Sequence, residues 1–389
     1  MKPVIAVPAI AGLLYRAWSH KTLTTLGLVA AGLTASAHAL HPWSTPFILL
    51  AVFYLGGSRV TKVKHEIKSR LTLSATGSEG GEGPRTHVQV LANSIVASVL
   101  ILAHTYVLAK RSAAGSNAAQ CFSNGHDVAD LLVVGIVANY AAVAADTFSS
   151  ELGILSTSKP RLITSPTFRV VPPGTNGGVT GTGLLAGMFG AFTIALSSAA
   201  FLPFCGAPQG GSTLGLLTSR AGWVAAVTAW GTLGSVLDSV LGGLFQASVV
   251  DKRTGKIVEG SGGKKVLVHP SSTKAGVSAN AAGLTPARGV SSSSSATQQL
   301  RATEDVANAA TAPAMFRGRR GEVGSSSSLV GETTTTTTTD DGHESRRVES
   351  GHDILDNNAV NVLMAVVMSV GAMGVAGWVW GVDGADLVW

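Results

Sequence analysis

The chain alternates between long apolar segments and short polar connections. Several apolar segments run for about 18 residues or more, the length at which an α-helix crosses the hydrocarbon core of a bilayer. A backbone inside lipid must satisfy its own hydrogen bonds, so we expect these segments to be helices. The pattern predicts candidate spans at residues 4–15, 23–40, 44–58, 88–109, 128–148, 180–203, 221–248 and 359–380. The first is short and contains Pro8, so we predict an all-α, polytopic transmembrane helix bundle of about seven or eight spans.

One region breaks this pattern. Residues 259–350 contain runs of serine and threonine and few large apolar side chains. A segment of this composition cannot bury enough apolar surface to offset the entropy lost on ordering. We therefore predict a long, disordered cytosolic insertion between residues 1–258 and residues 351–389, which together make the bundle. Its few basic residues allow contact with anionic lipid, although a solvated linker is the simpler interpretation.

Composition and charge also indicate a membrane protein. Only 13% of the residues are charged, against about 25% in soluble domains, and the mean hydropathy is +0.34 despite the polar insertion. The net charge is +6, but Lys and Arg concentrate in the connections after the third, fifth and seventh segments. This distribution is typical of cytosolic loops and excludes a nucleic-acid-binding face. Both termini would then face the opposite side, and we expect an endomembrane such as the endoplasmic reticulum.

The chain has two cysteines, Cys121 and Cys205, which are too few for a disulfide scaffold or a zinc site. The topology places both on the non-cytosolic side, where oxidation is possible. A disulfide needs Cα atoms within about 7 Å of each other, which the sequence does not establish. We therefore expect two unpaired thiols.

Candidate chemistry begins where the fifth apolar segment ends, in the sequence ADTFSSELG. Asp146 and Glu151 stand there at or just inside the membrane edge. A carboxylate inside a membrane is costly and by default functional, and on a helix these two could reach one cation. Two carboxylates with substrate phosphate oxygens suit Mg²⁺, so we predict Asp146 and Glu151 as catalytic residues and metal ligands. The alternative is a pair that faces water or forms ion pairs with nearby Lys and Arg.

The next connection, residues 159–183, combines basic and glycine-rich sequence. Glycines let successive backbone N–H groups turn into one concavity, and the helix N-terminus that follows adds further donors, which suits a phosphate group. The run is not a P-loop, and such a run alone is more often a simple interfacial turn. We predict catalytic roles for Lys159 and Arg161. The predicted nucleotide-binding residues are Gly174, Thr175, Asn176, Gly177 and Gly178, with Lys62 and Lys64 from an earlier connection.

Polar residues also interrupt the last two apolar segments. Asp238 stands in the middle of GTLGSVLDSVLGG, among glycines that allow close helix packing, so it must face the bundle interior, and we predict a catalytic role for it. The last segment opens with HDILDNNAVNV, where Asp356 or Asn357 is expected to cap the helix. The predicted substrate-binding or structural polar residues are Asn93, Asp356, Asn357, Asn358 and Asn361.

Several of these motifs occur in the order found in a known family. VTKVKHEIKSRL, QVLAN, ADTFSSELG, PRLITS, VPPGTNGG, GSVLDSVLGG and LDNNAVN together resemble the transmembrane protein 19 family of multi-span membrane proteins. The resemblance covers most of residues 20–250 and 350–375. Phe148 stands where tryptophan is usual, and the insertion is longer than the family's connection, so the resemblance assigns the insertion no function.

The resemblance implies a relation to plastid phytyl-phosphate kinases, which transfer a phosphoryl group from a nucleotide to an isoprenyl monophosphate. A looser similarity to membrane kinases of dolichol and phytol follows the order Asp146, Lys159, Gly174–Gly178. We therefore predict a kinase that uses Mg²⁺ and ATP or CTP on an isoprenoid phosphate at the cytosolic membrane face. The alternatives are a transporter of an anionic substrate, which would use Asp238 and Asn361, and a non-enzymatic membrane scaffold. The oligomeric state is left open.

Overall fold

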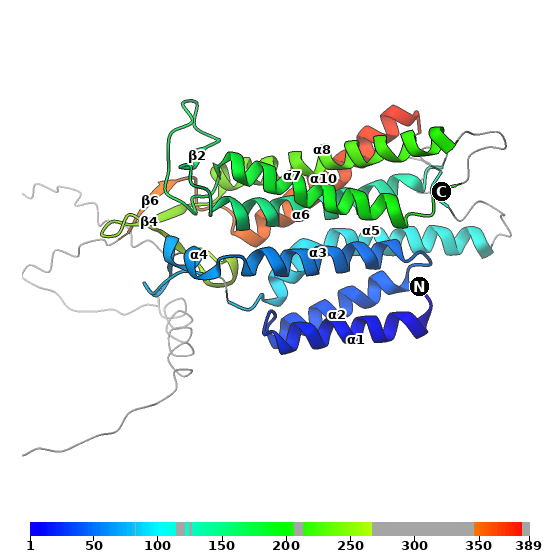
Figure 1. Ribbon diagram of the computed structural model, residues 1–389, viewed down its shortest axis with the longest axis horizontal. Coiled ribbons are helices and arrows are strands. Elements are labelled where there is room, and N and C mark those ends of the chain that lie inside the picture. Colours follow the sequence, from blue (N-terminus) through cyan, green and yellow to red (C-terminus); the bar gives the residue numbers. More distant parts are fainter. Residues whose placement is uncertain (82, 114–120, 124–126, 206–212, 267–345, 383–389) are drawn as a thin grey trace, which may run out of the picture. The chain divides into compact units, whose positions relative to one another are not determined.

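The computed structural model describes residues 1–81, 83–113, 121–123, 127–205, 213–266 and 346–382. These residues form a bundle of helices that run alongside one another, with short strands gathered at one end (Figure 1). The helices are α1 Pro3–Ser19, α2 Thr25–Leu40, α3 Thr45–Lys62, α4 His65–Leu71, α5 His87–Ala113, α6 Asp130–Gly153, α7 Gly181–Phe201, α8 Thr213–Phe245 and α10 Asn357–Trp380. The predicted all-α membrane bundle is thereby confirmed.

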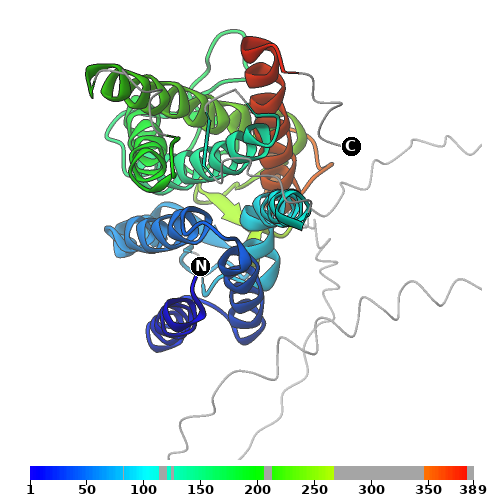
Figure 2. The ribbon, with the colours of Figure 1, turned by 90° about the vertical axis from the view of Figure 1, so that its right-hand side faces the viewer.

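The number of helices able to span the membrane is smaller than predicted. Among the described residues, α5, α6, α7, α8 and α10 are long and apolar enough, and α3 with α4 makes a sixth candidate if this pair, bent by 69°, is one span. The helices α1 and α2 have 17 and 16 residues. At 1.5 Å per residue they measure only about 24–26 Å, against about 30 Å of hydrocarbon. They form a hairpin at the margin of the bundle (Figure 2), so the sidedness of the later connections is the same whether or not they span.

Helix α6 is the centre of the bundle. In its most apolar stretch 89% of the residues are buried, against 22–39% in the other candidate spans. It contacts α3, α5, α7, α8 and α10, and small residues make the close approaches possible. A Cβ atom added at Gly234 of α8 would lie 2.5 Å from the Ala142 Cβ, and one at Gly190 of α7 would lie 2.6 Å from the Ala144 carbonyl oxygen. The packing role expected for glycines around Asp238 is therefore observed.

The helix ends follow from local capping. The Thr180 hydroxyl accepts a hydrogen bond from Gly183 N over 3.0 Å at the start of α7. At the start of α10, the Asp356 carboxylate accepts one from Ala359 N over 2.8 Å, so the cap is Asp356, one of the two candidates that the sequence offered. That helix ends at Gly381, whose φ of 66° suits glycine.

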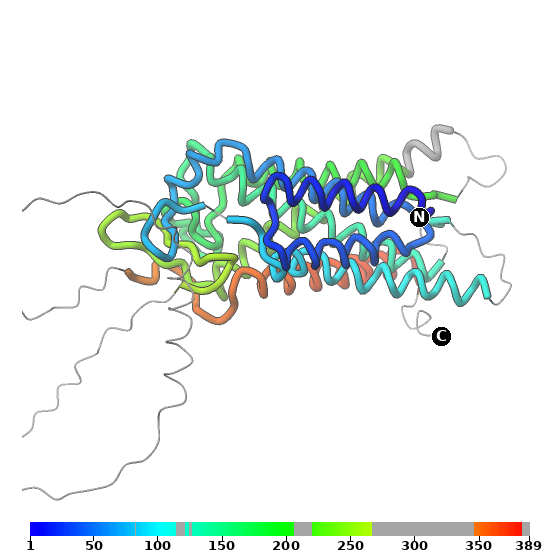
Figure 3. The backbone as a smooth tube through the Cα atoms, turned by 90° about the horizontal axis from the view of Figure 1, so that it is seen from below, coloured from blue at the N-terminus to red at the C-terminus, as the bar shows by residue number. Residues whose placement is uncertain are grey.

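Short strands cover the end of the bundle at which α6 ends (Figure 3). One sheet has the order β1-β5-β4-β6, in which β5 pairs parallel to β1 and antiparallel to β4, and β4 pairs antiparallel to β6. A second sheet pairs β2 with β3. The strands are β1 Leu73–Ser74, β2 Arg161–Leu162, β3 Gly178–Val179, β4 Ser248–Asp251, β5 Ile257–Glu259 and β6 Arg346–Ser350.

The sheet corrects the limits of the predicted insertion. Strand β5 reaches Glu259, a 3₁₀ turn follows at Ser261–Gly263, and β6 occupies Arg346–Ser350. Both margins of the segment predicted as disordered are thus ordered elements that pack with the helices. Their strands are too short to show an alternating pattern in the sequence. The rest of the insertion, residues 267–345, lies outside the described residues.

At the other end of the bundle, Cys121 and Cys205 form a disulfide bond. The bond joins the connection before α6 to the connection after α7. The prediction of two unpaired thiols is therefore wrong. The sequence could not predict the bond because Cys121 and Cys205 are 84 positions apart, and the packing of α6 against α7 brings them together.

Candidate functional site

A polar cavity of about 750 Å³ opens at the end of the bundle that carries the strands. It is lined by the ends of α6, α8 and the starts of α5, α7 and α10, and by parts of both sheets. Twelve of the residues predicted from the sequence line it: Asn93, Asp146, Glu151, Gly174, Thr175, Asn176, Gly177, Gly178, Asp238, Asp356, Asn357 and Asn361. Five others do not: Lys62, Lys64, Lys159, Arg161 and Asn358.

The two aspartates of the bundle meet on the inner surface of this cavity. Asp146 of α6 and Asp238 of α8 are half-buried, and their carboxyl groups lie within hydrogen-bonding distance of each other. Each lies seven residues before the last residue of its helix, which is Gly153 for α6 and Phe245 for α8. This spacing puts both carboxyl groups at one depth, roughly 10 Å from the helix ends.

A third helix adds an amide to the pair. With its side chain turned so that both contacts form, the Asn361 nitrogen donates to Asp238 Oδ1 over 3.2 Å and to the Asn357 carbonyl over 3.2 Å. Three elements that are far apart in the sequence therefore converge on one point of the cavity. The pair predicted to bind a cation was Asp146 with Glu151, whereas the structure brings Asp146 together with Asp238.

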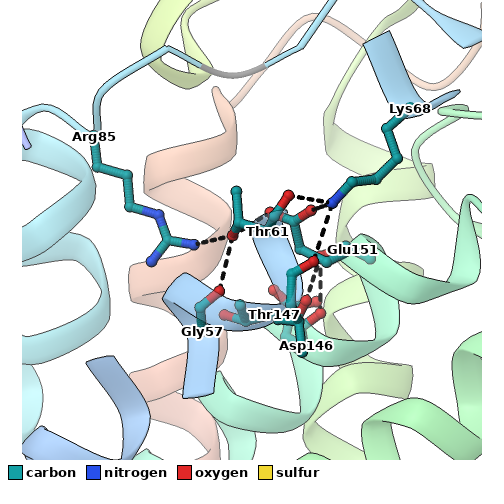
Figure 4. A network of polar contacts seen from close by, with 9 residues as sticks. Gly57, Thr61, Lys68, Arg85, Asp146, Thr147 and Glu151 are labelled. Carbon is teal, nitrogen blue, oxygen red and sulfur yellow. Dashed lines mark hydrogen bonds and ion pairs between the residues drawn. The ribbon is translucent and has the colours of Figure 1, made fainter. Parts of the chain in front are cut away.

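Glu151 has a different environment (Figure 4). Its Oε1 accepts a hydrogen bond from the Thr61 hydroxyl over 2.7 Å, and its Oε2 forms an ion pair with Lys68. The Lys68 ammonium group also donates to the Thr61 carbonyl over 2.7 Å and to the Val60 carbonyl over 3.2 Å. Only 9% of the Lys68 side chain and 16% of the Glu151 side chain are exposed. Both carboxylate oxygens are thus occupied by protein donors, which is the ion-pair alternative considered for this residue.

The glycine-rich loop is folded against α8. Gly174 and Gly177 have φ angles of 84° and 77°, and a Cβ atom at Gly177 would lie 2.7 Å from the Gly243 Cα. The loop therefore needs glycine for its conformation and for close packing. Several of its amides are already used, because Asn176 N donates to Ser248 Oγ over 2.9 Å and Gly178 N to the Thr175 carbonyl over 2.9 Å. The structure thus shows these N–H groups holding the loop rather than turned into an open concavity.

The basic residues predicted beside this loop point elsewhere. Lys62, Lys64 and Lys159 are exposed, and Arg161, also exposed, donates to the Phe168 carbonyl over 3.1 Å. The basic residues that do line the cavity are Arg85, Lys264 and Lys265. Sequence reasoning counted these three only as signs of cytosolic connections.

Further polar residues of the cavity were missed although a signal for them exists. Gln89 lies four residues before Asn93 on α5. Gly242 follows Asp238 by four residues on α8, and Gln246, the residue just after the end of α8, follows by four more. Residues four apart share one face of a helix. Extending the predicted residues by one helical turn would have found Gln89 and Gly242, and a second turn beyond Asp238 would have found Gln246. No comparable signal marks Lys264 and Lys265, which follow a strand that the sequence did not predict.

Comparison with known proteins supports the family resemblance. The sequence model described as "Integral membrane protein DUF92" matches residues 8–369. Protein PGR of Arabidopsis thaliana is 36% identical over 248 residues, which cover 62% of this chain and 80% of that protein. Uncharacterized membrane protein MJ0933 of Methanocaldococcus jannaschii is 43% identical over 114 residues, which cover 29% of this chain and 40% of that protein.

Another relative in Arabidopsis thaliana is Protein VTE6, chloroplastic, which is 28% identical over 173 residues, or 44% of this chain and 46% of that protein. No solved structure shows significant similarity to the chain. The family match extends from α1 to α10 and so includes every helix that lines the cavity. The chain is a member of the integral membrane protein DUF92 family.

Proposed function

We propose that this protein is a Mg²⁺-dependent phosphotransferase, which transfers a phosphoryl group from ATP or CTP to an isoprenyl monophosphate at the cytosolic membrane face. The observation that carries the proposal is the meeting of Asp146 and Asp238 inside a polar cavity at the membrane edge. Two half-buried carboxylates this close repel each other unless a proton or a cation lies between them. The plastid phytyl-phosphate kinases that the family resembles provide the reaction class by analogy only.

The donor set fits magnesium. Mg²⁺ prefers oxygen ligands and usually binds through one or two carboxylates together with substrate phosphates and water. Asp146 and Asp238 supply two carboxylates, and the amide of Asn361 orients one of them. Within the described residues no group of three or more His, Cys, Asp or Glu side chains is close enough to hold a metal ion alone. A cation here would therefore depend on substrate oxygens, as in other phosphoryl-transfer sites.

An apolar groove supports a lipid as the second substrate. It has a volume of about 940 Å³ and lies between α7 and α8, the helices whose cytosolic turns line the polar cavity. Leu184 of α7 lines the cavity, and Met188, Phe192 and Leu196 continue along the groove at intervals of four residues. These positions share one helix face. A hydrocarbon chain lying in this groove would place its phosphate in the cavity.

The chemistry needs little covalent help from the protein. A phosphate oxygen of the lipid attacks the γ-phosphorus of the nucleotide, and the bond from that phosphorus to the bridging oxygen breaks. An ionised phosphate is already a nucleophile, so no general base is required. When bound, Mg²⁺ would neutralise charge on the phosphates. The role of Asp146, Asp238 and Asn361 is then to position the reactants and to hold the cation beside the phosphates, where negative charge develops in the transition state.

Sidedness agrees with this assignment. The cavity lies at the end of the bundle that carries the basic connections, which the positive-inside rule assigns to the cytosol. The disulfide lies at the other end, and disulfides persist in oxidising compartments. An endomembrane such as the endoplasmic reticulum satisfies both conditions.

The test is a transfer assay with the full-length protein purified in detergent. Labelled ATP or CTP is supplied with Mg²⁺ and a panel of isoprenyl monophosphates, and labelled lipid diphosphate is the expected product. Asp146→Asn should abolish the product, whereas Glu66→Gln, which alters an exposed acid on α4, should not. Nucleotide-independent flux of an anion across vesicles, most sensitive to Asp238→Asn, would instead identify a transporter. A protein that binds no nucleotide and moves no anion would fit a scaffold.

A further inference from the structure

The loop Gly260–Lys265 enters the cavity from the end of β5. It belongs to the part of the chain that the sequence assigned to a disordered insertion. Every residue of the loop, including Gly260, Ser261 and Lys264, contributes to the cavity lining. It is therefore part of the wall of the cavity that also contains the aspartate pair, not a linker.

Its conformation requires glycine and is held from two sides. Gly262 and Gly263 have φ angles of 66° and 77°, which side-chain-bearing residues rarely adopt. The Asn358 amide donates to the Gly262 carbonyl over 3.0 Å, and a Cβ atom at Gly262 would lie 3.2 Å from the Thr86 side chain. Asn358 is itself buried in the first turn of α10. The loop is thus fixed between α5 and α10, and its bare glycine backbone lines the cavity where a ligand can approach closely.

The charges of the cavity wall single out one lysine. Most ionisable residues of the lining are acidic, and its basic residues are Arg85, Lys264 and Lys265. Arg85 donates to the Thr61 hydroxyl over 3.1 Å, so it is already engaged in the network around Glu151. Lys265 pairs with the Asp353 carboxylate over 3.1 Å and donates to two backbone carbonyls. Lys264 is exposed and forms no ion pair with any residue that the structure describes.

We propose that the loop Gly260–Lys265 is a phosphate-binding site, in which Lys264 contacts the phosphate group and Lys265 anchors the loop to the segment before α10. An anion that enters an acidic cavity needs a local positive charge, and Lys264 is the lysine of the lining that can supply it. Gly262 and Gly263, immediately before Lys264, let the phosphate lie close to the backbone. The proposal rests on the proposed function only for the identity of the ligand, which is the nucleotide or the lipid monophosphate.

The experiment measures binding of four probes to the full-length protein in detergent with Mg²⁺: ATP, CTP, inorganic triphosphate and farnesyl monophosphate. We expect Lys264→Gln to raise the Kd for at least one of them about tenfold, a loss of about 1.4 kcal/mol, and Lys264→Arg to restore most of the affinity. Weaker binding of ATP, CTP and triphosphate identifies the nucleotide as the ligand. Weaker binding of farnesyl monophosphate alone identifies the lipid headgroup. The matched controls are Lys21→Gln and Arg253→Gln, exposed basic residues outside the cavity, which should bind as the wild type does.

The proposal is overturned if Lys264→Gln binds all four probes normally, if the control variants lose as much affinity, or if the wild type binds none of them. Gly263→Val provides a second variant, since a side chain at a φ of 77° should distort the loop and also weaken binding. Phosphoryl-transfer activity, measured on the same preparations, separates the proposed phosphate-binding loop from the proposed phosphotransferase function. Lysine-dependent binding without transfer would retain the phosphate site and reject the kinase. Transfer that is unchanged in Lys264→Gln would retain the kinase and reject this site.

Discussion

The two ends of the bundle treat buried polar groups in opposite ways. At the end that carries the disulfide, several polar side chains are paired with one another, although Trp43 Nε1 and Arg220 Nε lack a hydrogen-bond partner among the described residues. His41 Nδ1 accepts a hydrogen bond from Trp43 N over 3.0 Å, so its Nε2 carries the proton and donates to His104 Nδ1 over 2.8 Å. Arg111 forms a two-bond ion pair with Asp127. These hydrogen bonds and this ion pair satisfy the polar atoms that they join, which is the arrangement expected of a structural core.

At the cavity end, polar groups are instead left facing open space or a group of the same charge. Asp146 contacts Asp238, the glycine loop exposes its backbone, and Lys264 has no ion-pair partner among the described residues. Burying such groups costs stability unless a ligand completes them. Burial of polar groups alone therefore does not identify a functional site. Buried polar groups that the protein itself satisfies support the fold, and those left unsatisfied around a cavity indicate function.

The largest effect that this comparison predicts is on turnover. Asp146→Asn and Asp238→Asn should each lower the rate of phosphoryl transfer by about 1,000-fold, because charge stabilisation at the reacting phosphates is lost. Tyr140→Phe is the matched control, since Tyr140 lies on the same helix and pairs with His38. It should keep normal turnover with a small loss of stability. Equal losses of activity in the three variants would show that the polar groups of the cavity matter no more for turnover than Tyr140 does.

The disulfide should have the next largest effect, on stability only. Cys121→Ser opens a loop of 84 residues, for which chain entropy predicts a loss of about 4.5 kcal/mol as an upper value. Thermal unfolding followed in detergent should show a lower midpoint, and a reducing agent should lower the wild-type midpoint in the same way. Ligand binding at the cavity, measured well below that midpoint, should not change. A wild-type protein whose electrophoretic mobility is insensitive to reduction would contradict the bond.

The ion pair of Lys68 and Glu151 tests whether a polar group of the cavity lining supports the fold or binds a ligand. Glu151→Gln leaves the buried Lys68 ammonium without its carboxylate, which should cost about 3 kcal/mol. The double variant Lys68→Met with Glu151→Gln should recover much of that loss, because no unpaired charge remains. Affinity for Mg²⁺, measured by titration in the presence of nucleotide, should stay near the wild-type value in both. Weaker Mg²⁺ binding with unchanged stability would show instead that Glu151 is a metal ligand, as the sequence first indicated.

The sequence was informative where a polar residue interrupts an apolar segment. Asp146, Asp238 and Asn361 stand out because such a residue is costly in lipid and must face the bundle interior. The helices themselves follow from hydrophobic length, and only the short α1 and α2 misled the count of spans. These features depend on local sequence, which is why they were predictable.

Contacts between distant segments were not predictable. Glu151 was grouped with Asp146 by proximity, but its partner Lys68 comes 83 positions earlier and is returned to the membrane face by the bend before α4. The phosphate-facing loop was missed because β5 is only three residues long and is fixed by pairing with β1, far back in the chain. Strands this short show no alternating pattern, so their neighbours were assigned to the insertion.

The smallest effect concerns Asp127, in the connection before α6. Burial acts to raise the pKa of this carboxyl group, but the hydrogen bonds from Arg111 and Ala129 N outweigh burial and hold the pKa below its usual value. A carboxylate whose pKa is lower in the folded state stabilises the fold above its unfolded value of about 4, and this stabilisation is lost as the pH falls toward the folded value. Asp127→Asn should therefore destabilise the protein by about 1 kcal/mol at neutral pH. The difference in unfolding midpoint between variant and wild type should stay constant from pH 8 to pH 5 and shrink below about pH 4. Turnover should be unaffected, because this residue lies outside the cavity lining. A difference that persists unchanged to pH 3, or a loss of transfer activity, would show that Asp127 does more than pair with Arg111.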